Sequence, residues 1–337
     1  MLHIFTQYDI DELTIKRDGE VKLGQKVSVL DDEKDFFEEV ANNKSSFVLI
    51  GIPEDIGVKM NKGQGGAHTA FFPALKAFLN TQENQFISGK EILVLGYLDF
   101  LDTVETFIAD DAEKGDYLVK QIDKELSELI HFIVSLDKIP IIIGGGHNNA
   151  YGNIKGMSTA LQHKINVINM DAHSDLRKLE ERHSGNGFSY ALEDGYLDRY
   201  FMFGLHENYT PQYIFEFIHD QLNIEYTMFE EMYIYQTTSF DNELTRAKNF
   251  IKTKPYGIEL DLDCIQQFPS SAMTPSGFLP EQARRFVHFM AKHKNASYLH
   301  ICEGAPSISN QPNADAQVGK YISYLITDFI KAKELFI

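Results

Sequence analysis

Short apolar runs, rich in β-branched residues, recur along the chain and alternate with longer amphipathic segments. Most of these runs are continuous rather than alternating, which is typical of parallel strands that are covered on both faces of a sheet. They predict eight strands, at Phe47–Gly51, Ile92–Gly96, Ile139–Ile143, Ile165–Met170, Tyr200–Leu205, Ile224–Phe229, Tyr256–Leu262 and Tyr298–Cys302.

Helices are predicted between these strands. The clearest spans about Lys114–Leu136 and places apolar residues such as Ile122, Leu126 and Ile133 on one face at a spacing of 3.6 residues. The chain shows no repeat, low-complexity tract or linker, so the alternation favours one α/β domain with a mostly parallel sheet. The other helices are expected near Asn148–Gln162, Pro211–Gln221, Asp241–Lys252, Pro280–Lys292 and Asp315–Lys331.

The balance of charge restricts the partners of this protein. Lys and Arg total 31 against 49 Asp and Glu, a formal charge of −18, which argues against nucleic-acid and anionic-membrane partners. The first residues lack a basic region followed by an apolar core, and no apolar run approaches about 18 residues, so we expect neither a signal peptide nor a membrane span. The two cysteines, Cys264 and Cys302, suit buried thiols in a reducing compartment, so a cytoplasmic protein is expected.

Three strand ends are rich in metal-ligand side chains. Asp171, His173 and Asp175 follow the run Ile165–Met170, and similar clusters occur at Glu259-Leu-Asp261-Leu-Asp263 and at Gly144-Gly-Gly-His147. Taken alone, the segment from Asp171 to Asp175 could equally be a solvated loop, two carboxylates at one strand end are common, and a single histidine such as His147 is more often structural. Together they favour a metal site, because the carboxyl ends of parallel strands meet at one edge of a sheet.

The number of candidate ligands predicts two cations. Four carboxylates and two imidazoles are enough to hold a pair of divalent ions, the usual apparatus for activating water. If the chain stays extended beyond the strands, alternate residues such as Asp261 and Asp263 point the same way. Carboxylates this crowded would repel one another unless a cation balanced them.

The order of these motifs resembles that of the ureohydrolase (arginase/agmatinase) superfamily, from about Leu49 to the C-terminal helix. The resemblance implies a three-layer α/β/α fold with a central, mostly parallel eight-stranded sheet. It implies a single domain over residues 1–337, with residues 1–45 as an N-terminal extension that packs on it. The motifs are Gly-Gly-Gly-His147-Asn, Asn-Met-Asp171-Ala-His173-Ser-Asp175, Glu-Leu-Asp261-Leu-Asp263 and His-Ile-Cys-Glu303-Gly-Ala-Pro306.

The resemblance also implies the metal ligands and the metal. Asp171 and Asp261 would bridge two ions, one ion being completed by His147 and Asp175 and the other by His173 and Asp263. Two Mn²⁺ per subunit are expected, which agrees with the oxygen-rich ligand set. Zinc and nickel stay open because two imidazoles are present.

Finer features resemble the formimidoylglutamase branch of the superfamily. Gly146 precedes the metal histidine where arginases and agmatinases usually have Asp, and Phe188 occupies the position of the histidine proton shuttle of arginases. Gln64, Asn148 and the segment 268–277 depart from the branch pattern, so the substrate is less well defined than the chemistry. The segments that carry the branch resemblance are Pro53-Glu-Asp-Ile-Gly57, Asn61-Lys-Gly63, Asp175-Leu-Arg177 and Ser184-Gly-Asn-Gly-Phe188.

By this resemblance the reaction is hydrolysis of a C–N bond in a linear amidine, N-formimidoyl-L-glutamate plus water giving L-glutamate and formamide. Asp175 would carry the proton, Glu303 would pair with the amidinium, and Arg177 would bind the substrate carboxylate bidentately. Further polar contacts are expected from Ser184, Asn186, His206 and Asn208, and His183 is an alternative proton shuttle.

Three alternatives remain. The first is a sibling enzyme that releases urea from a guanidino compound. The second, a zinc deacetylase of related fold, would use one metal and would not need Asp263 together with His147. The third is a metal-bound relic that serves as a structural or regulatory subunit. In each case we expect a homo-oligomer, and for the enzymes a small-molecule amidine or guanidine substrate.

Overall fold

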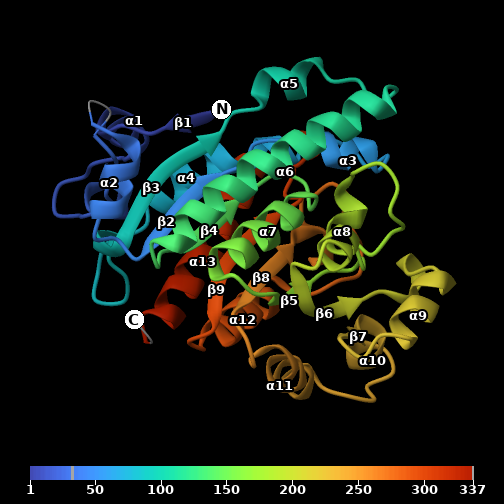
Figure 1. The fold of residues 1–337 in the computed structure, drawn as a ribbon. Helices are drawn as coiled ribbons and strands as arrows, with labels where there is room; N and C mark the ends of the chain where they lie inside the picture. Colours follow the sequence, from blue (N-terminus) through green and yellow to red (C-terminus); the bar gives the residue numbers. More distant parts are fainter. Residues whose placement is uncertain (32–33, 336–337) are drawn as a thin grey trace.

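The computed structural model describes residues 1–31 and 34–335, and a single sheet crosses this part of the chain (Figure 1). The sheet has nine strands in the order β1-β3-β2-β4-β9-β8-β5-β6-β7. All neighbouring pairs are parallel except β1 with β3. The strands are β1 Leu2–Ile4, β2 Phe47–Gly51, β3 Ile92–Leu98, β4 Ile139–Ile143, β5 Ile165–Met170, β6 Leu197–Leu205, β7 Ile224–Met228, β8 Tyr256–Asp261 and β9 Ala296–Cys302.

Thirteen α-helices accompany the sheet in the described residues. Figure 1 shows α6 and α7 in front of the sheet and α13 behind it. The helices are α1 Gln7–Leu13, α2 Phe36–Asn42, α3 Ile56–Met60, α4 Phe71–Leu79, α5 Leu101–Thr106, α6 Ala112–Ser135, α7 Asn149–Leu161, α8 Gly187–Glu193, α9 Gln212–His219, α10 Phe229–Tyr233, α11 Phe240–Ile251, α12 Pro280–Ala291 and α13 Ala314–Lys333.

The sheet separates two hydrophobic cores. In β4, Ile141 and Ile143 belong to the core that contains residues of α4, α11, α12 and α13, whereas Ile142 belongs to the core of α6, α7 and α9. Successive side chains of a strand point to opposite faces, so both faces of a central strand must be apolar. This burial on both sides explains why the strands appear as continuous apolar runs, and it confirms the three-layer α/β/α class.

The predicted number of strands was wrong by one. The ninth strand is β1, which pairs antiparallel with β3 and forms one edge of the sheet. It has three residues, too few for a periodicity signal. The pairing needs Gly96, which has φ +139°, because a Cβ there would lie 1.8 Å from the carbonyl oxygen of His3.

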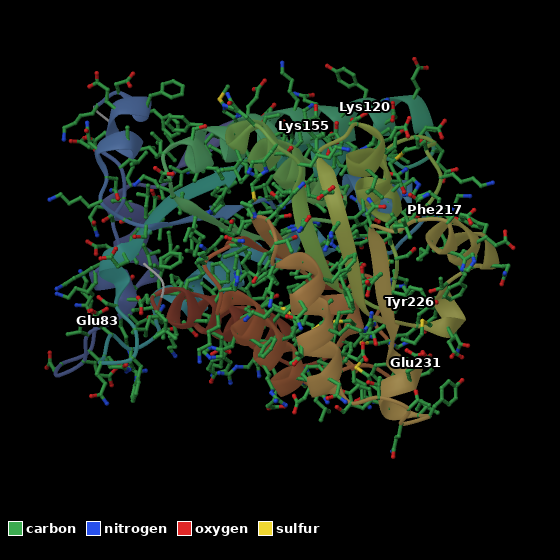
Figure 2. All side chains as sticks on the ribbon, turned by 60° about the horizontal axis from the view of Figure 1, so that its bottom comes forward. Glu83, Lys120, Lys155, Phe217, Tyr226 and Glu231 are labelled. Atoms are coloured by element: carbon green, nitrogen blue, oxygen red, sulfur yellow. The ribbon has the colours of Figure 1, made fainter. Side chains whose placement is uncertain are left out.

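Figure 2 shows Glu83 at one side of the molecule, and Phe217 of α9 and Tyr226 of β7 at the opposite side.

The six predicted helices are present, and their ends lie within two residues of the prediction. The largest helix that the pattern missed is α4, whose residues Phe71, Leu75 and Phe78 are fully buried in the core shared with α13. No helix in the described residues is both long and apolar enough to cross a membrane. Residues 32–33 of the expected extension and the last two residues of the expected domain lie outside the described part, and this division of the chain stays a prediction.

Candidate active site

Four adjacent strands deliver the candidate ligands to one edge of the sheet. His147 follows β4, Glu303 follows β9, Asp261 ends β8 and Asp171 follows β5. These strands are neighbours in the order β4-β9-β8-β5 and are all parallel. Their carboxyl ends therefore lie side by side, which brings together residues more than 150 positions apart in the sequence.

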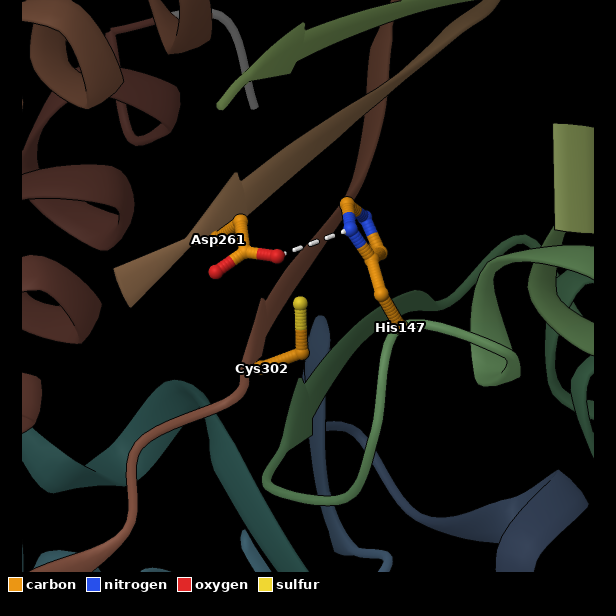
Figure 3. A group of neighbouring side chains, drawn as sticks. All are labelled: His147, Asp261 and Cys302. Atoms are coloured by element: carbon orange, nitrogen blue, oxygen red, sulfur yellow. Dashed lines mark hydrogen bonds and ion pairs between the residues drawn. The ribbon is translucent and has the colours of Figure 1, made fainter. Parts of the chain in front are cut away.

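His147 lies at the centre of the cluster and is fully buried. Its Nδ1 is 2.9 Å from Asp175 Oδ2, 3.1 Å from Asp261 Oδ2 and 3.3 Å from Asp171 Oδ2. One ligand atom from each of these four residues lies within 4.8 Å of the others, which is a spacing that one metal ion can span. Figure 3 shows the thiol of Cys302 pointing toward His147 and Asp261 from below.

Two aspartates also shape the backbone around the cluster. Asp171 Oδ1 accepts a hydrogen bond from the backbone N–H of His173, and Asp261 Oδ1 accepts one from the backbone N–H of Asp263, each at 2.7 Å. Each aspartate thus closes a tight turn directly after its strand while its other oxygen faces His147. The same turn, closed by the aspartate side chain, occurs at both predicted bridging positions.

The expectation of an extended chain at these motifs was wrong. Asp263 lies in a short 3₁₀ helix, Leu262–Cys264, and Asp175 has φ +48°, in the left-handed region. Turns, not strand alternation, bring Asp175 and Asp263 toward the site. The ligands still converge because each turn begins at the same edge of the sheet.

His173 and Asp263, the residues predicted to complete a second metal site, lie on the outer side of the cluster. His173 Nδ1 is 3.4 Å from Asp171 Oδ1. The Asp263 carboxylate accepts hydrogen bonds from the backbone N–H of Ala272 at 2.9 Å and from the hydroxyl of Ser271 at 3.2 Å. Both side chains line the same pocket, so a second ion has ligands beside the first cluster.

The electrostatics of the cluster fit a cation. Burial, together with the charges of Asp263 and Asp171, raises the pKa of Asp261 well above its usual range. Burial and the charge of Asp171 also raise the pKa of Asp175. Burial alone would lower the pKa of His173, but the Asp171 carboxylate raises it to about 10. Acids buried together in this way resist ionisation by themselves, and a bound divalent ion would supply the missing positive charge.

A pocket of about 460 Å³ opens onto the cluster. Glu303, 3% exposed, lies in this pocket; its Oε1 accepts a hydrogen bond from the backbone N–H of His147 at 2.7 Å, and its buried Oε2 has no hydrogen-bond partner among the described residues. Burial and the charge of Asp263 raise the pKa of Glu303 to about 8. Glu303 therefore offers this pocket a carboxyl group with one oxygen that lacks a hydrogen-bond partner among the described residues.

The outer part of the pocket carries Arg177 and Ser184. The side chain of Arg177 is 51% exposed, and its Nη1 donates a hydrogen bond to Asn61 Oδ1 at 2.7 Å. Asn61 Nδ2 in turn donates to the hydroxyl of Ser184 at 3.2 Å. Asn61 was not among the predicted contacts, although the Asn61-Lys-Gly63 motif signalled the segment.

Three other predicted contacts do not line this pocket. The side chain of Asn186 is buried and accepts a hydrogen bond from Arg182 Nη1 at 2.6 Å. His206 is buried against the ring of Phe229, with centroids 4.7 Å apart, and Asn208 is exposed to solvent. Tyr209, two residues before Pro211, lines the pocket from this loop instead.

His183 is the alternative proton shuttle considered above, and Phe188 occupies the shuttle position of arginases. Both ring nitrogens of His183 are engaged: Nδ1 accepts from the backbone N–H of Gly185 and Nε2 lies 3.0 Å from Glu180. Phe188 is fully buried, where it stacks on Tyr200 with ring centroids 4.3 Å apart. Neither residue lines the pocket.

Comparison with known proteins identifies a matching family and similar sequences. The model of the arginase family matches residues 45–326. Formimidoylglutamase of Lysinibacillus sphaericus is 25% identical over 293 residues, which cover 84% of this chain and 84% of that protein. The enzyme of that name from Chromobacterium violaceum is 27% identical over 242 residues, 70% of this chain and 72% of the relative.

Solved structures share the fold. Formimidoylglutamase of Bacillus subtilis aligns with a TM-score of 0.72 at 19% identity, over 95% of this chain and 94% of that one. Formiminoglutamase of Trypanosoma cruzi, whose structure contains Mn²⁺, aligns with a TM-score of 0.70 at 18% identity, over 93% and 99%.

Proposed function

The chain belongs to the arginase family, and from this premise we propose that it hydrolyses the C–N bond of a linear amidine, N-formimidoyl-L-glutamate, to give L-glutamate and formamide. The observation that carries this proposal is a pair of opposite charges in the pocket that the metal ligands do not use, the buried acid Glu303 and the half-exposed Arg177. The substrate has a cationic amidinium at one end and carboxylates at the other, so both ends find opposite charge. The names of the similar proteins support the same substrate.

The proposed cofactor is a pair of Mn²⁺ ions. His147, Asp175 and the bridging Asp171 and Asp261 would hold one ion, and the same bridging pair with His173 and Asp263 would hold the other. When bound, such a pair supplies positive charge that polarises the substrate and lowers the pKa of a water molecule. The oxygen-rich donor set favours manganese, with zinc and nickel as the alternatives that two imidazoles allow.

Asp175 is proposed as the proton carrier. It lines the pocket beside the water that the metal pair would activate, where a carboxylate can take a proton from that water and pass it to the departing amine. Glu303 is proposed to orient the amidinium, because a carboxylate accepts two N–H groups of a planar cation in parallel. Glu303 lines the pocket, the backbone N–H of His147 fixes its Oε1, and its Oε2 has no hydrogen-bond partner among the described residues.

Arg177 is proposed to select the substrate. A guanidinium binds a carboxylate through two parallel N–H groups; Arg177 Nη1 bonds Asn61, and Nη2 lies 3.7 Å from Glu180 Oε1, a half-exposed pair that a substrate carboxylate would replace. Ser184, held by Asn61, adds a hydroxyl to the same wall. Agmatine has no carboxylate for Arg177, and the buried Phe188 offers no proton shuttle of the arginase type.

One assay tests the proposal. The manganese-loaded protein is incubated with formimidoylglutamate, arginine and agmatine, and formamide and urea are measured separately. Formamide from formimidoylglutamate, with little urea from the other two, is the expected result. If agmatine is turned over faster, the substrate assignment fails but the hydrolase survives. If no compound is turned over with two ions bound, the protein is better explained as a metal-bound relic.

Three related predictions accompany this function. We propose that the chain forms a single catalytic domain, assembles as a homo-oligomer and acts in the cytoplasm. Size-exclusion chromatography with light scattering and cell fractionation would test the last two directly.

A further inference from the structure

A second cluster of buried polar side chains lies under the metal ligands, and the proposed reaction uses none of it. Glu259 of β8 and His300 of β9 are neighbours in the sheet, and both are fully buried. Glu259 Oε2 lies 2.5 Å from His300 Nδ1, and Glu259 Oε1 accepts a hydrogen bond from the hydroxyl of Tyr298 at 2.7 Å. The carboxylate is therefore held at both oxygens.

His147 connects this cluster to the ligands above it. Its Nδ1 faces Asp171, Asp175 and Asp261, whereas its Nε2 points the other way and lies 3.7 Å from Glu259 Oε2. Nε2 is buried and has no hydrogen-bond partner in the described part of the chain. A buried ring nitrogen without a partner is costly, so the pair Nε2 and Glu259 Oε2 requires an explanation.

The requirements of a histidine that binds a metal explain this arrangement of Nε2 and Glu259. An imidazole that binds a cation through Nδ1 carries its proton on Nε2, and that N–H needs an acceptor that fixes the tautomer and the ring orientation. Glu259 Oε2 lies on the correct side. A shift of roughly 0.8 Å would bring the pair to normal hydrogen-bond length.

We propose that Glu259 is the positioning residue for His147: it accepts the Nε2–H of that ring and holds Nδ1 toward the metal, while Tyr298 and His300 hold Glu259 in place. This inference rests on the metal site of the proposed function but not on the identity of the substrate. The competing explanation is that Glu259 only bonds His300 and Tyr298 within the core and does nothing for the metal.

Metal affinity distinguishes the two explanations. Mn²⁺ is titrated into metal-free Glu259→Gln, and free Mn²⁺ is measured from its electron paramagnetic resonance signal. Gln has one acceptor oxygen instead of two and carries no charge, so it accepts the Nε2–H of His147 more weakly, and one of the two ions should bind about 10–100-fold more weakly. Asp123→Asn is the matched control: it also neutralises a buried carboxylate, but one that is bonded to Arg182 and not to His147.

The control variant should melt at a lower temperature and keep its Mn²⁺ affinity within about twofold, because its lesion leaves the metal ligands alone. If Glu259→Gln behaves in the same way, with lower stability and unchanged affinity for both ions, the positioning role is refuted. If Glu259→Gln does not fold, Glu259→Asp takes its place: it keeps the charge beside His300 but withdraws the oxygen from His147. A wild-type affinity in Glu259→Asp then refutes the proposal. Failure of the wild type to hydrolyse formimidoylglutamate leaves these binding results unaffected.

Discussion

Replacing Asp123 with leucine should destabilise the protein by about 3–5 kcal/mol, because the change leaves the charge of Arg182 buried and unpaired. Arg182 is 1% exposed and belongs to the loop before α8, from which its side chain reaches Asp123 of α6. Its guanidinium also lies over the rings of Tyr151 and Tyr190, each 5.1 Å away. Water therefore cannot replace the lost carboxylate without opening this packing.

The magnitude follows from the hydrogen bonds of the guanidinium. Arg182 has five N–H donors, and each has an acceptor. Asp123 accepts two of them, at 2.9 and 3.0 Å, and loss of both leaves two buried donors at about 1–3 kcal/mol each. Burial raises the pKa of Asp123 more than the charge of Arg182 lowers it, so the ion pair is costly to bury and still more costly to break. The other acceptors are the carbonyls of His183 and Asn148 and the side chain of Asn186.

Urea unfolding measures the effect. The chain has no tryptophan but 16 tyrosines, so tyrosine fluorescence and far-ultraviolet circular dichroism are the suitable probes. Their transitions must coincide before a free energy is extracted, because a chain of this length can populate intermediates. Lys254→Gln is the control, since its ion pair with Asp198 is 42% and 32% exposed and should contribute less than about 1 kcal/mol.

A loss below about 1 kcal/mol in Asp123→Leu, equal to that of the surface control, would refute the reasoning. A further check uses Arg182→Met. Since both single variants break the two hydrogen bonds between Asp123 and Arg182, the double variant should lose less free energy than the two single losses combined. Additive losses would mean that the two side chains stabilise the fold independently.

Three further predictions concern the site and its surroundings. Asp261→Ala should lower bound metal from two ions toward one or none and abolish turnover, and elemental analysis that finds two full equivalents would reject the bridging role. Arg177→Ala should raise KM for formimidoylglutamate by about tenfold with little change in kcat, because its exposed guanidinium loses one charge-assisted contact; Lys178→Ala, the neighbouring control, should not. Burial lowers the pKa of Lys333 to about 8, below its value of roughly 10.4 in the unfolded chain, so the unfolded state binds more protons between these values and stability should rise with pH across that window. Lys333→Met should remove the part of the rise in stability that Lys333 causes. Urea midpoints of the wild type and of this variant, measured from pH 7 to 10.5, would reveal it.

The sequence predicted the central strands because both faces of each are buried. Ile141, Ile142 and Ile143 point alternately into two cores, so the run is apolar at every position and stands out in any window. The ligands were predictable for a related reason, since they directly follow such runs. His147 and Asp171 needed only the rule that parallel strands end at one edge.

Other features depend on contacts between distant segments and carry no local signal. β1 is a strand because three residues fit against Gly96, and a three-residue pattern cannot be distinguished from chance. Asn61 reaches the site by bonding Arg177, 116 positions away. Asn186 was predicted to contact substrate because it is polar and lies in a loop, but Arg182 draws its side chain inward, which no property of Asn186 itself indicates.

The pairing of β1 with β3 has a consequence for handling the protein. All residues of β3 are buried, and they read Ile-Leu-Val-Leu-Gly-Tyr-Leu, a sequence with high β-propensity and no charge. β1 occupies the hydrogen-bonding edge of that strand at Gly96–Leu98, Ser28 bonds the same strand at Ile92 and Val94, and together they block pairing with a second molecule. A protease that removes the first few residues would expose this edge at Gly96–Leu98, while the ligands on β4, β5, β8 and β9 stay in place. Clipped preparations should therefore bind metal at first and then precipitate through β3.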